Sequence, residues 1–224
     1  MFKNSGISFV RRPSDDATRR VAEGAGGTRR SRRSGRGQTL VEFTLVFPFF
    51  LILLFSVIEF AFALNALLSL DFATREAALA AAEAGSAPTA DCSILRAVER
   101  SVEAPADDRQ LTQVRIFKSK ANGDPVSPTQ QMLYVRDESK SLDCPQSDGT
   151  AGTLPYADGT GTYTNDTRCN TLLGCGPGST TVDTIGVEAT YVYRWYTPLP
   201  KLLPQSGTGY VMTQGNAMRM EPVQ

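Results

Sequence analysis

The stretch Phe43-Thr-Leu-Val-Phe-Pro-Phe-Phe-Leu-Ile-Leu-Leu-Phe-Ser-Val-Ile-Glu-Phe-Ala-Phe-Ala-Leu64 decides the organisation of this chain. Its 22 residues carry one charged side chain, Glu59, and are apolar all round a helix. A transmembrane helix needs about 20 mainly apolar residues, whereas a helix on a soluble core keeps a polar face. The stretch therefore predicts a membrane span at about 43–64. Pro48 lies inside it, so we expect a kink or a local loosening there.

Charge is distributed unevenly around this stretch. Residues 1–37 hold ten Lys and Arg against three Asp and Glu, a net charge of +7, and the other 187 residues carry −7. Basic segments beside a membrane span stay on the cytoplasmic side. We therefore expect residues 1–37 to be a cytoplasmic leader rather than a nucleic-acid-binding arm, and the C-terminal part to be exported.

Helical signals run from about Thr39 to Ala84, in front of a typical C-capping residue, Gly85. They predict a long helix over 38–85, followed by an exported α+β domain over 86–224 with an antiparallel sheet. The Ala-rich part of this helix favours helix formation, and its small residues would also permit close packing against other helices. Within the exported domain we expect a short amphipathic helix with Asp91 as its N-cap, and a long surface loop at about 137–180. The strands are expected at Gln113–Ser119, Met132–Arg136, Thr184–Tyr196 and Tyr210–Met220, the first two separated by a turn at Asn122–Pro125. In the third strand every second residue from Ile185 to Trp195 is apolar, which predicts one buried face.

All cysteines lie in the part expected to be exported, where an oxidising environment permits disulfides. They are Cys92, Cys144, Cys169 and Cys175. Free buried thiols and a zinc site are the alternatives, but the chain has no His and no CxxC motif. Sequence leaves three possible pairings. The short separation of Cys169 and Cys175 slightly favours closing that loop and leaving Cys92 to Cys144.

A second signal lies where the leader meets the helix. The leader ends at Gly37, the apolar helix follows from Gln38, and a carboxylate, Glu42, stands five residues after the glycine. This arrangement resembles the processing signal of prepilins and pseudopilins. The resemblance implies a cut after Gly37 by a prepilin peptidase, with Gln38 as the new first residue. The Glu42 carboxylate would then neutralise a freed α-amine, its own or that of a neighbouring subunit, because an unpaired charge in lipid is costly.

The wider sequence resembles the TadE-like family of tight-adherence pilus assembly. The resemblance rests on Gly37–Pro48, Val57–Phe60 and Ala73–Ala78, and more loosely on Val187–Tyr193, Thr197–Leu199 and Met218–Pro222. It implies a pseudopilin-like subunit in the bacterial cytoplasmic (inner) membrane, single-pass, with a cytoplasmic N-terminus and a periplasmic or extracellular C-terminal domain. The implied partners are the membrane, a prepilin peptidase, other pilins or pseudopilins and the assembly platform.

Other functions are less well supported by the residues. An anchored surface, binding or adhesion domain that is never processed is the alternative. With no His, no nucleophile elbow and no phosphate-binding loop, the chain is not expected to be an enzyme or to hold a metal or cofactor. Glu59 is expected either to reach the outer interface or to pair with a cationic group of a partner helix.

Overall fold

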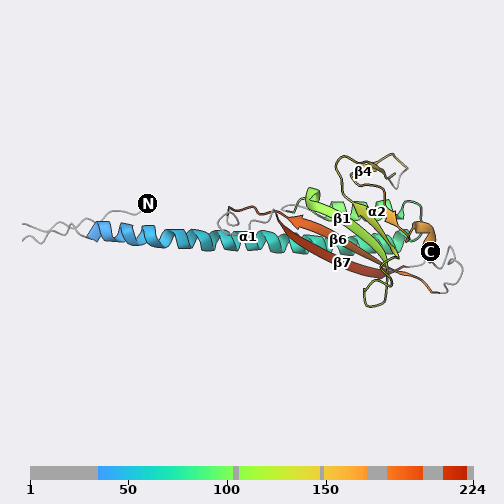
Figure 1. Ribbon diagram of the computed structural model, residues 1–224, viewed down its shortest axis with the longest axis horizontal. Helices are drawn as coiled ribbons and strands as arrows, with labels where there is room; N and C mark the ends of the chain where they lie inside the picture. The colour runs from blue at the N-terminus through green and yellow to red at the C-terminus, as the bar shows by residue number, and fades with distance from the viewer. Residues whose placement is uncertain (1–34, 103–105, 147–148, 171–180, 199–208, 221–224) are drawn as a thin grey trace, which may run out of the picture. The chain divides into compact units, whose positions relative to one another are not determined.

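The computed structural model describes residues 35–102, 106–146, 149–170, 181–198 and 209–220. The fold is α+β, as the sequence predicts, with one long N-terminal helix, one short helix and an antiparallel sheet (Figure 1). The helices are α1 (Gly35–Ala84) and α2 (Ala90–Ser101), with 3-10 turns η1 (Asp108–Gln110) and η2 (Asn165–Thr167). The strands are β1 (Leu111–Ser119), β2 (Gln131–Val135), β3 (Leu142–Asp143), β4 (Thr153–Leu154), β5 (Thr160–Gly161), β6 (Thr184–Tyr193) and β7 (Tyr210–Arg219).

Helix α1 begins a few residues before the predicted Thr39 and continues through Pro48. Its 50 residues correspond to about 75 Å of helix at 1.5 Å per residue. It ends where predicted, because Gly85 adopts a φ of 57° and its N–H donates to the Ala81 carbonyl over 3.1 Å. The chain divides into two compact units, Met1–Leu45 and Val46–Gln224. Most of the leader lies outside the described residues.

The second unit is built on a five-stranded antiparallel sheet of order β5-β2-β1-β6-β7. The alternation predicted for β6 is confirmed, since every second residue from Ile185 to Tyr193 is at most 1% exposed. The strand ends at Tyr193, however, and not at Tyr196. Trp195, expected to continue the buried series, is 45% exposed. Beyond the strand, the backbone N–H groups of Tyr196 and Thr197 donate to the Glu59 side chain on helix α1.

The core lies between the sheet and the second half of α1, over which β6 and β7 lie in Figure 1. Helix α1 contributes four alanines and one leucine at helical spacing, so that the backbone of the helix can approach the sheet closely. They are Ala66, Leu70, Ala73, Ala77 and Ala81, all at most 3% exposed. This face of the Ala-rich stretch, which the sequence left available for helix bundling, is therefore covered by the chain's own domain.

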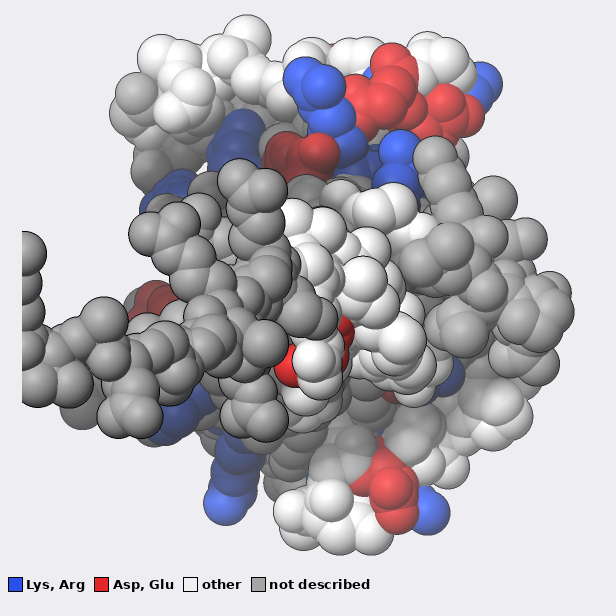
Figure 2. Space-filling model, turned by 90° about the vertical axis from the view of Figure 1, so that its left-hand side faces the viewer, with Lys and Arg blue, Asp and Glu red and all other residues white. Residues whose placement is uncertain are grey.

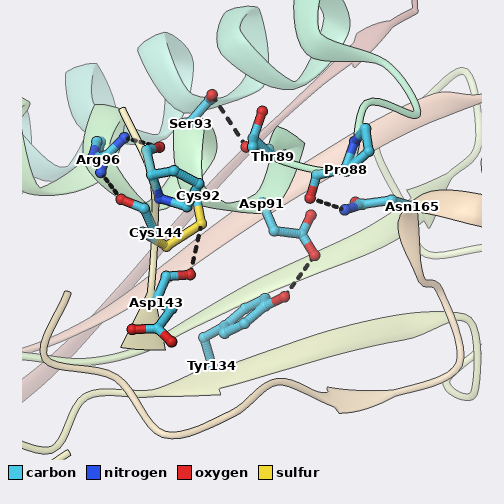
Figure 3. Close-up of a disulfide and its surroundings, with 11 residues drawn as sticks. Pro88, Thr89, Asp91, Cys92, Ser93, Arg96, Tyr134, Asp143, Cys144 and Asn165 are labelled. Atoms are coloured by element: carbon cyan, nitrogen blue, oxygen red, sulfur yellow. Dashed lines mark hydrogen bonds between the residues drawn. A yellow bond between two sulfur atoms is a disulfide. The ribbon is translucent and has the colours of Figure 1, made fainter. Parts of the chain in front are cut away.

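Helix α2 also packs on this core, but its N-terminus differs from the prediction. The N-cap is Thr89, and Asp91 lies inside the first turn. The Asp91 carboxylate accepts a hydrogen bond from the Tyr134 hydroxyl over 2.6 Å (Figure 3). It accepts another from the guanidinium of Arg168. The N-cap interpretation was wrong because a buried cation and a tyrosine, both distant in sequence, bind the carboxylate and draw it into the core. Burial, followed by the Asp91 charge, raises the pKa of Tyr134 well above its usual range.

A disulfide joins Cys92 of α2 to Cys144, just after β3, and it is the pairing that the sequence slightly favoured (Figure 3). Beside it the Arg96 guanidinium donates to the Cys144 carbonyl and, over 2.8 Å, to that of Pro145. Cys169 is also disulfide-bonded, and Cys175 lies outside the described residues. The predicted loop at 137–180 is more structured than expected, because β5 adds a fifth strand to the sheet and Tyr163 is 2% exposed.

Candidate functional site

The predicted processing site lies in the first turns of α1. An added Cβ on Gly37 would meet no atom within 4 Å, so the described fold does not itself require glycine there. Glycine in a helix is less favourable than alanine by about 1 kcal/mol, which weakens the helix at this point. The Gln38 side-chain amide donates to Glu42 over 3.2 Å, one helical turn away. The three residues predicted from the sequence thus lie together on exposed helix, and their roles stay predictions.

The part of α1 that follows is apolar and almost uncovered. Phe43, Phe49 and Leu53 are 63%, 71% and 61% exposed, and most of the side chains between them are also exposed. The helix is long and apolar enough to cross a membrane. Because so much apolar surface does not stay in water on a soluble protein, this exposure fits a single-pass membrane protein.

The uncovered stretch ends at Glu59, which is only 4% exposed. Its carboxylate accepts three hydrogen bonds from the end of β6 and the residues that follow it. The Tyr193 hydroxyl donates over 2.6 Å, and the backbone N–H groups of Tyr196 and Thr197 donate over 3.1 and 2.8 Å. The donors are neutral groups of its own chain and not a cationic group, and the expectation that Glu59 lies at the outer interface stays a prediction. Such a set of donors satisfies a buried carboxylate without a cation.

Tyr193 holds the sheet end of this contact. Its side chain is 1% exposed, and it packs edge-on against the rings of Trp195 and Tyr196, at centroid distances of 5.9 and 6.0 Å. Burial, followed by its hydrogen bond to Glu59, raises the pKa of the Tyr193 hydroxyl above its ordinary value. The hydroxyl therefore stays protonated at neutral pH and remains a donor to Glu59.

Contacts on both sides of Glu59 fix the start of the C-terminal domain on the helix. The ring of Phe62 lies 5.1 Å from that of Tyr196, and Ala63 packs against the core. The last turn of the predicted span, up to Leu64, is therefore partly occupied by the domain. The sequence signal for this contact is the single carboxylate in the apolar run, Glu59. Its partners could not be predicted, because they lie more than 130 residues away.

The outer half of α1 has a second contact with the sheet through Thr74, which is fully buried. Its hydroxyl accepts a hydrogen bond from the side-chain amide of Asn216 in β7 over 2.8 Å and donates to the Asp71 carbonyl over 3.0 Å. The two flanking alanines, Ala73 and Ala77, are also fully buried. The motif Ala73–Ala78 thus has a structural reason, which is close packing of helix on sheet.

The opposite face of the same half-helix is apolar but uncovered. We call it the outward stripe: four large side chains spaced four residues apart, so that they lie on one side of α1. They are Phe60 (65% exposed), Leu64 (43%), Leu68 (58%) and Phe72 (60%). The sequence reasoning missed this stripe, because all-round apolarity hid which residues the sheet would cover.

Comparison with known families identifies the same part of the chain. A family model described as TadE-like protein matches residues 37–79. These residues resemble a TadE-like domain. The TadE-like domain contains Gly37, Gln38, Glu42, Glu59, the outward stripe and Thr74, so the predicted resemblance is confirmed there. It does not reach the looser C-terminal resemblance, which stays a prediction. No curated protein and no solved structure matches the chain.

The TadE-like domain associates the chain with the membrane and with a tight-adherence pilus at a general level. It carries the apolar helix, the carboxylates at its two ends and the packing motif, but none of the cysteines. Within the described ranges, no group of three or more His, Cys, Asp or Glu side chains is placed to hold a metal ion. Two uncovered apolar regions of α1 are candidate functional surfaces.

Proposed function

We propose that the chain is a pseudopilin-like subunit that takes part in assembly of a tight-adherence type IV-type pilus. It is inserted through α1, cut after Gly37 by a prepilin peptidase, and acts by packing its helix against other subunits rather than by catalysis. The observation that carries the proposal is the outward stripe, because it continues the apolar surface of α1 beyond the point at which the exported domain begins.

The position of Glu59 limits how far lipid can cover the helix. A hydrocarbon core is about 30 Å thick. Helix from Phe43 to Ile58 spans only about 24 Å, whereas helix from Gln38 to Ile58 spans about 31 Å. A span that stops below Glu59 therefore starts at Gln38, the first residue after the proposed cut. Glu42 then lies just inside the inner edge of the lipid, where a carboxylate needs a partner.

A cut after Gly37 supplies that partner. It creates an α-amine at Gln38, one helical turn from Glu42, whose carboxylate already accepts a hydrogen bond from the Gln38 side chain. The amine and the carboxylate neutralise each other, within one subunit or between neighbours. The basic leader, at +7, supports an orientation with this end in the cytoplasm.

The outward stripe lies on the other side of Glu59. Leu64, Leu68 and Phe72 are therefore outside the lipid and, in an isolated subunit, exposed to water. Covering one large apolar side chain is worth about 1.5–3 kcal/mol, so the stripe contributes several kcal/mol to association before the entropy of association is subtracted. The helix of a neighbouring subunit is the occupant that fits a straight stripe of this kind.

The processing step is tested on the protein isolated from its host. Mass spectrometry of the N-terminus should find Gln38 as the first residue. Gly37→Leu should leave the full-length precursor in the membrane, while Gly27→Leu, the same change within the leader, should be cut normally. If the unaltered protein still begins at Met1, the chain is an anchored surface or adhesion domain and not a processed subunit.

The assembly step is tested at the outward stripe. Leu68→Glu should leave insertion and cutting intact but remove the protein from complexes recovered with partner pilins, because a charge would be buried between helices. Leu79→Glu places the same charge on an exposed leucine of α1, two turns beyond the end of the stripe, and should be tolerated. Normal partner recovery and piliation with Leu68→Glu would contradict the proposed role of the stripe.

Glu42 is tested separately from the stripe. Glu42→Gln should be inserted and cut but should fail to join the pilus machinery, because the freed amine at Gln38 would lack its partner. An unpaired charge there costs at least about 2.5 kcal/mol, enough to shift an assembly equilibrium more than tenfold. The matched control is Glu83→Gln, an exposed carboxylate near the far end of α1. Normal piliation with Glu42→Gln would reduce Glu42 to an interfacial carboxylate.

A further inference from the structure

A group of exposed apolar side chains lies at one end of the sheet, where β6 ends and β7 begins. We call it the aromatic collar: Trp195, Tyr196, Tyr210 and Val211, which are 45%, 49%, 61% and 59% exposed. The two strands are paired at this end, with Tyr193 opposite Tyr210 and Val192 opposite Val211. The collar therefore combines residues far apart in sequence at a single edge of the domain.

The collar lies beside Glu59, where the uncovered apolar stretch of α1 ends. Glu59 accepts from the backbone N–H of Tyr196, and the Tyr196 ring packs on Phe62 one turn further along the helix. Figure 2 looks onto this side of the molecule. Most of the described Lys, Arg, Asp and Glu side chains lie toward its margins, and one acidic side chain lies among uncharged ones near its centre. Arg194, next to the collar, is exposed.

We propose that the aromatic collar is a lipid-docking surface, which lies in the headgroup region of the outer leaflet and holds the exported domain against the membrane. The proposal rests on insertion of α1, which is part of the proposed function. Trp and Tyr are the residues enriched at membrane–water interfaces, because their rings are apolar and one end forms hydrogen bonds. Arg194 adds a cation that can reach lipid phosphates.

The position of the collar favours lipid over a second protein subunit as its occupant. The collar is continuous with the apolar part of α1, so a bilayer that surrounds this helix up to Glu59 reaches the rings without any further movement. Trp195, Tyr210 and Val211 lie at the edge of the sheet, whereas a neighbouring helix would use the outward stripe along α1. The collar thus sets the height of the domain above the bilayer, and the stripe provides the contact between subunits.

The chain contains one tryptophan, Trp195, which is itself the probe. The full chain is reconstituted into vesicles of phosphatidylcholine and phosphatidylglycerol, with or without phosphatidylcholine brominated near the top or the end of the acyl chain. Tryptophan fluorescence should be lost most strongly with bromine near the top of the chain, and less with bromine at the end. Aqueous iodide should quench it weakly. Val211→Glu should lift the collar into water, so that iodide quenches Trp195 strongly and brominated lipid quenches it weakly.

A matched control places the probe at the other end of the sheet. Trp195→Phe with Val126→Trp keeps one tryptophan, at a position 43% exposed and so nearly as open as Trp195. Val126 bonds to Lys118, which pairs with Ile185 near the start of β6, about 30 Å along the strand from Tyr193. Its fluorescence should be quenched by iodide and should not respond to brominated lipid.

Other outcomes overturn the proposal and separate it from the proposed function. If Trp195 is quenched by iodide and ignores brominated lipid while the protein resists carbonate extraction, α1 is inserted and the collar lies in water. Protection from both quenchers, together with cross-linked dimers, assigns the collar to a second copy of the chain. If carbonate extracts the protein, insertion itself fails and the proposed function fails with it.

Discussion

Removing the Glu59 carboxylate should destabilise the exported domain more than removing any exposed carboxylate of α1. Glu59→Ala leaves three donors without their acceptor: the Tyr193 hydroxyl and the N–H groups of Tyr196 and Thr197. The hydroxyl is buried, so it bears the full penalty of about 1–3 kcal/mol for an unsatisfied donor. The two N–H groups are only partly buried and regain some bonding to water.

Together these terms predict a loss of about 3–5 kcal/mol for Glu59→Ala, because charge-assisted bonds are stronger than neutral ones. Glu59→Gln keeps one acceptor oxygen and the same shape, so a smaller loss of about 1–2 kcal/mol is expected. Tyr193→Phe removes only one of the three bonds and should cost a similar amount. Since Glu59 and Tyr193 share a hydrogen bond, the double variant Glu59→Gln with Tyr193→Phe should lose less than the sum of its parts.

The assay is urea unfolding of the full chain in mild detergent, followed by the fluorescence of Trp195, two residues from Tyr193. Glu83→Ala is the matched control, because this exposed carboxylate lies on the same helix and should change stability by less than about 0.5 kcal/mol. If Glu59→Ala and Glu83→Ala unfold at the same urea concentration, the three hydrogen bonds do not stabilise the domain and the reasoning from them is wrong.

Three further changes test the packing around this contact. Cys92→Ser with Cys144→Ser opens a loop with a sequence separation of 52 and should lower stability by about 4 kcal/mol on the chain-entropy model, measured against the oxidised wild type. Asn216→Ala should cost about 1–2 kcal/mol, because buried Thr74 loses a donor; equal urea midpoints would contradict this. Gly186→Ala places a Cβ 2.3 Å from the Phe117 ring and should cost about 1–3 kcal/mol, seen as a lower melting temperature.

Periodicity alone predicted the elements whose signals are local. The apolar run and the alanines that follow specify α1, and the alternation from Ile185 to Tyr193 specifies β6, because burial on one face leaves a regular pattern in the sequence. The Asn122–Pro125 turn is found as well, with Gly123 at a φ of 91°. The ends of the elements were less well predicted. Strand β6, for example, ends before the residues whose backbone N–H groups donate to Glu59.

Contacts between distant segments could not be predicted in the same way. The carboxylates of Asp91 and Glu59 are bound by groups 43 to 138 residues away, and nothing in the local pattern specifies such partners. The outward stripe and the aromatic collar depend on the same information, because only the packed sheet decides which apolar side chains of α1 and β6 stay uncovered. Gly37, Gln38 and Glu42 could be named from the sequence because they form a short local motif, and their roles stay predictions.

The contact between Glu59 and the end of β6 also decides where this protein can be shortened. Cutting behind the apolar run, after Leu64, would remove the acceptor for Tyr193 and the ring on which Tyr196 packs. The remaining fragment would keep its strands but lose the support at one end of the sheet. A water-soluble version for crystallography or antibody production should therefore begin near Val57, retain Glu59 and Phe62, and exchange Phe60, Leu64 and Leu68 for polar residues.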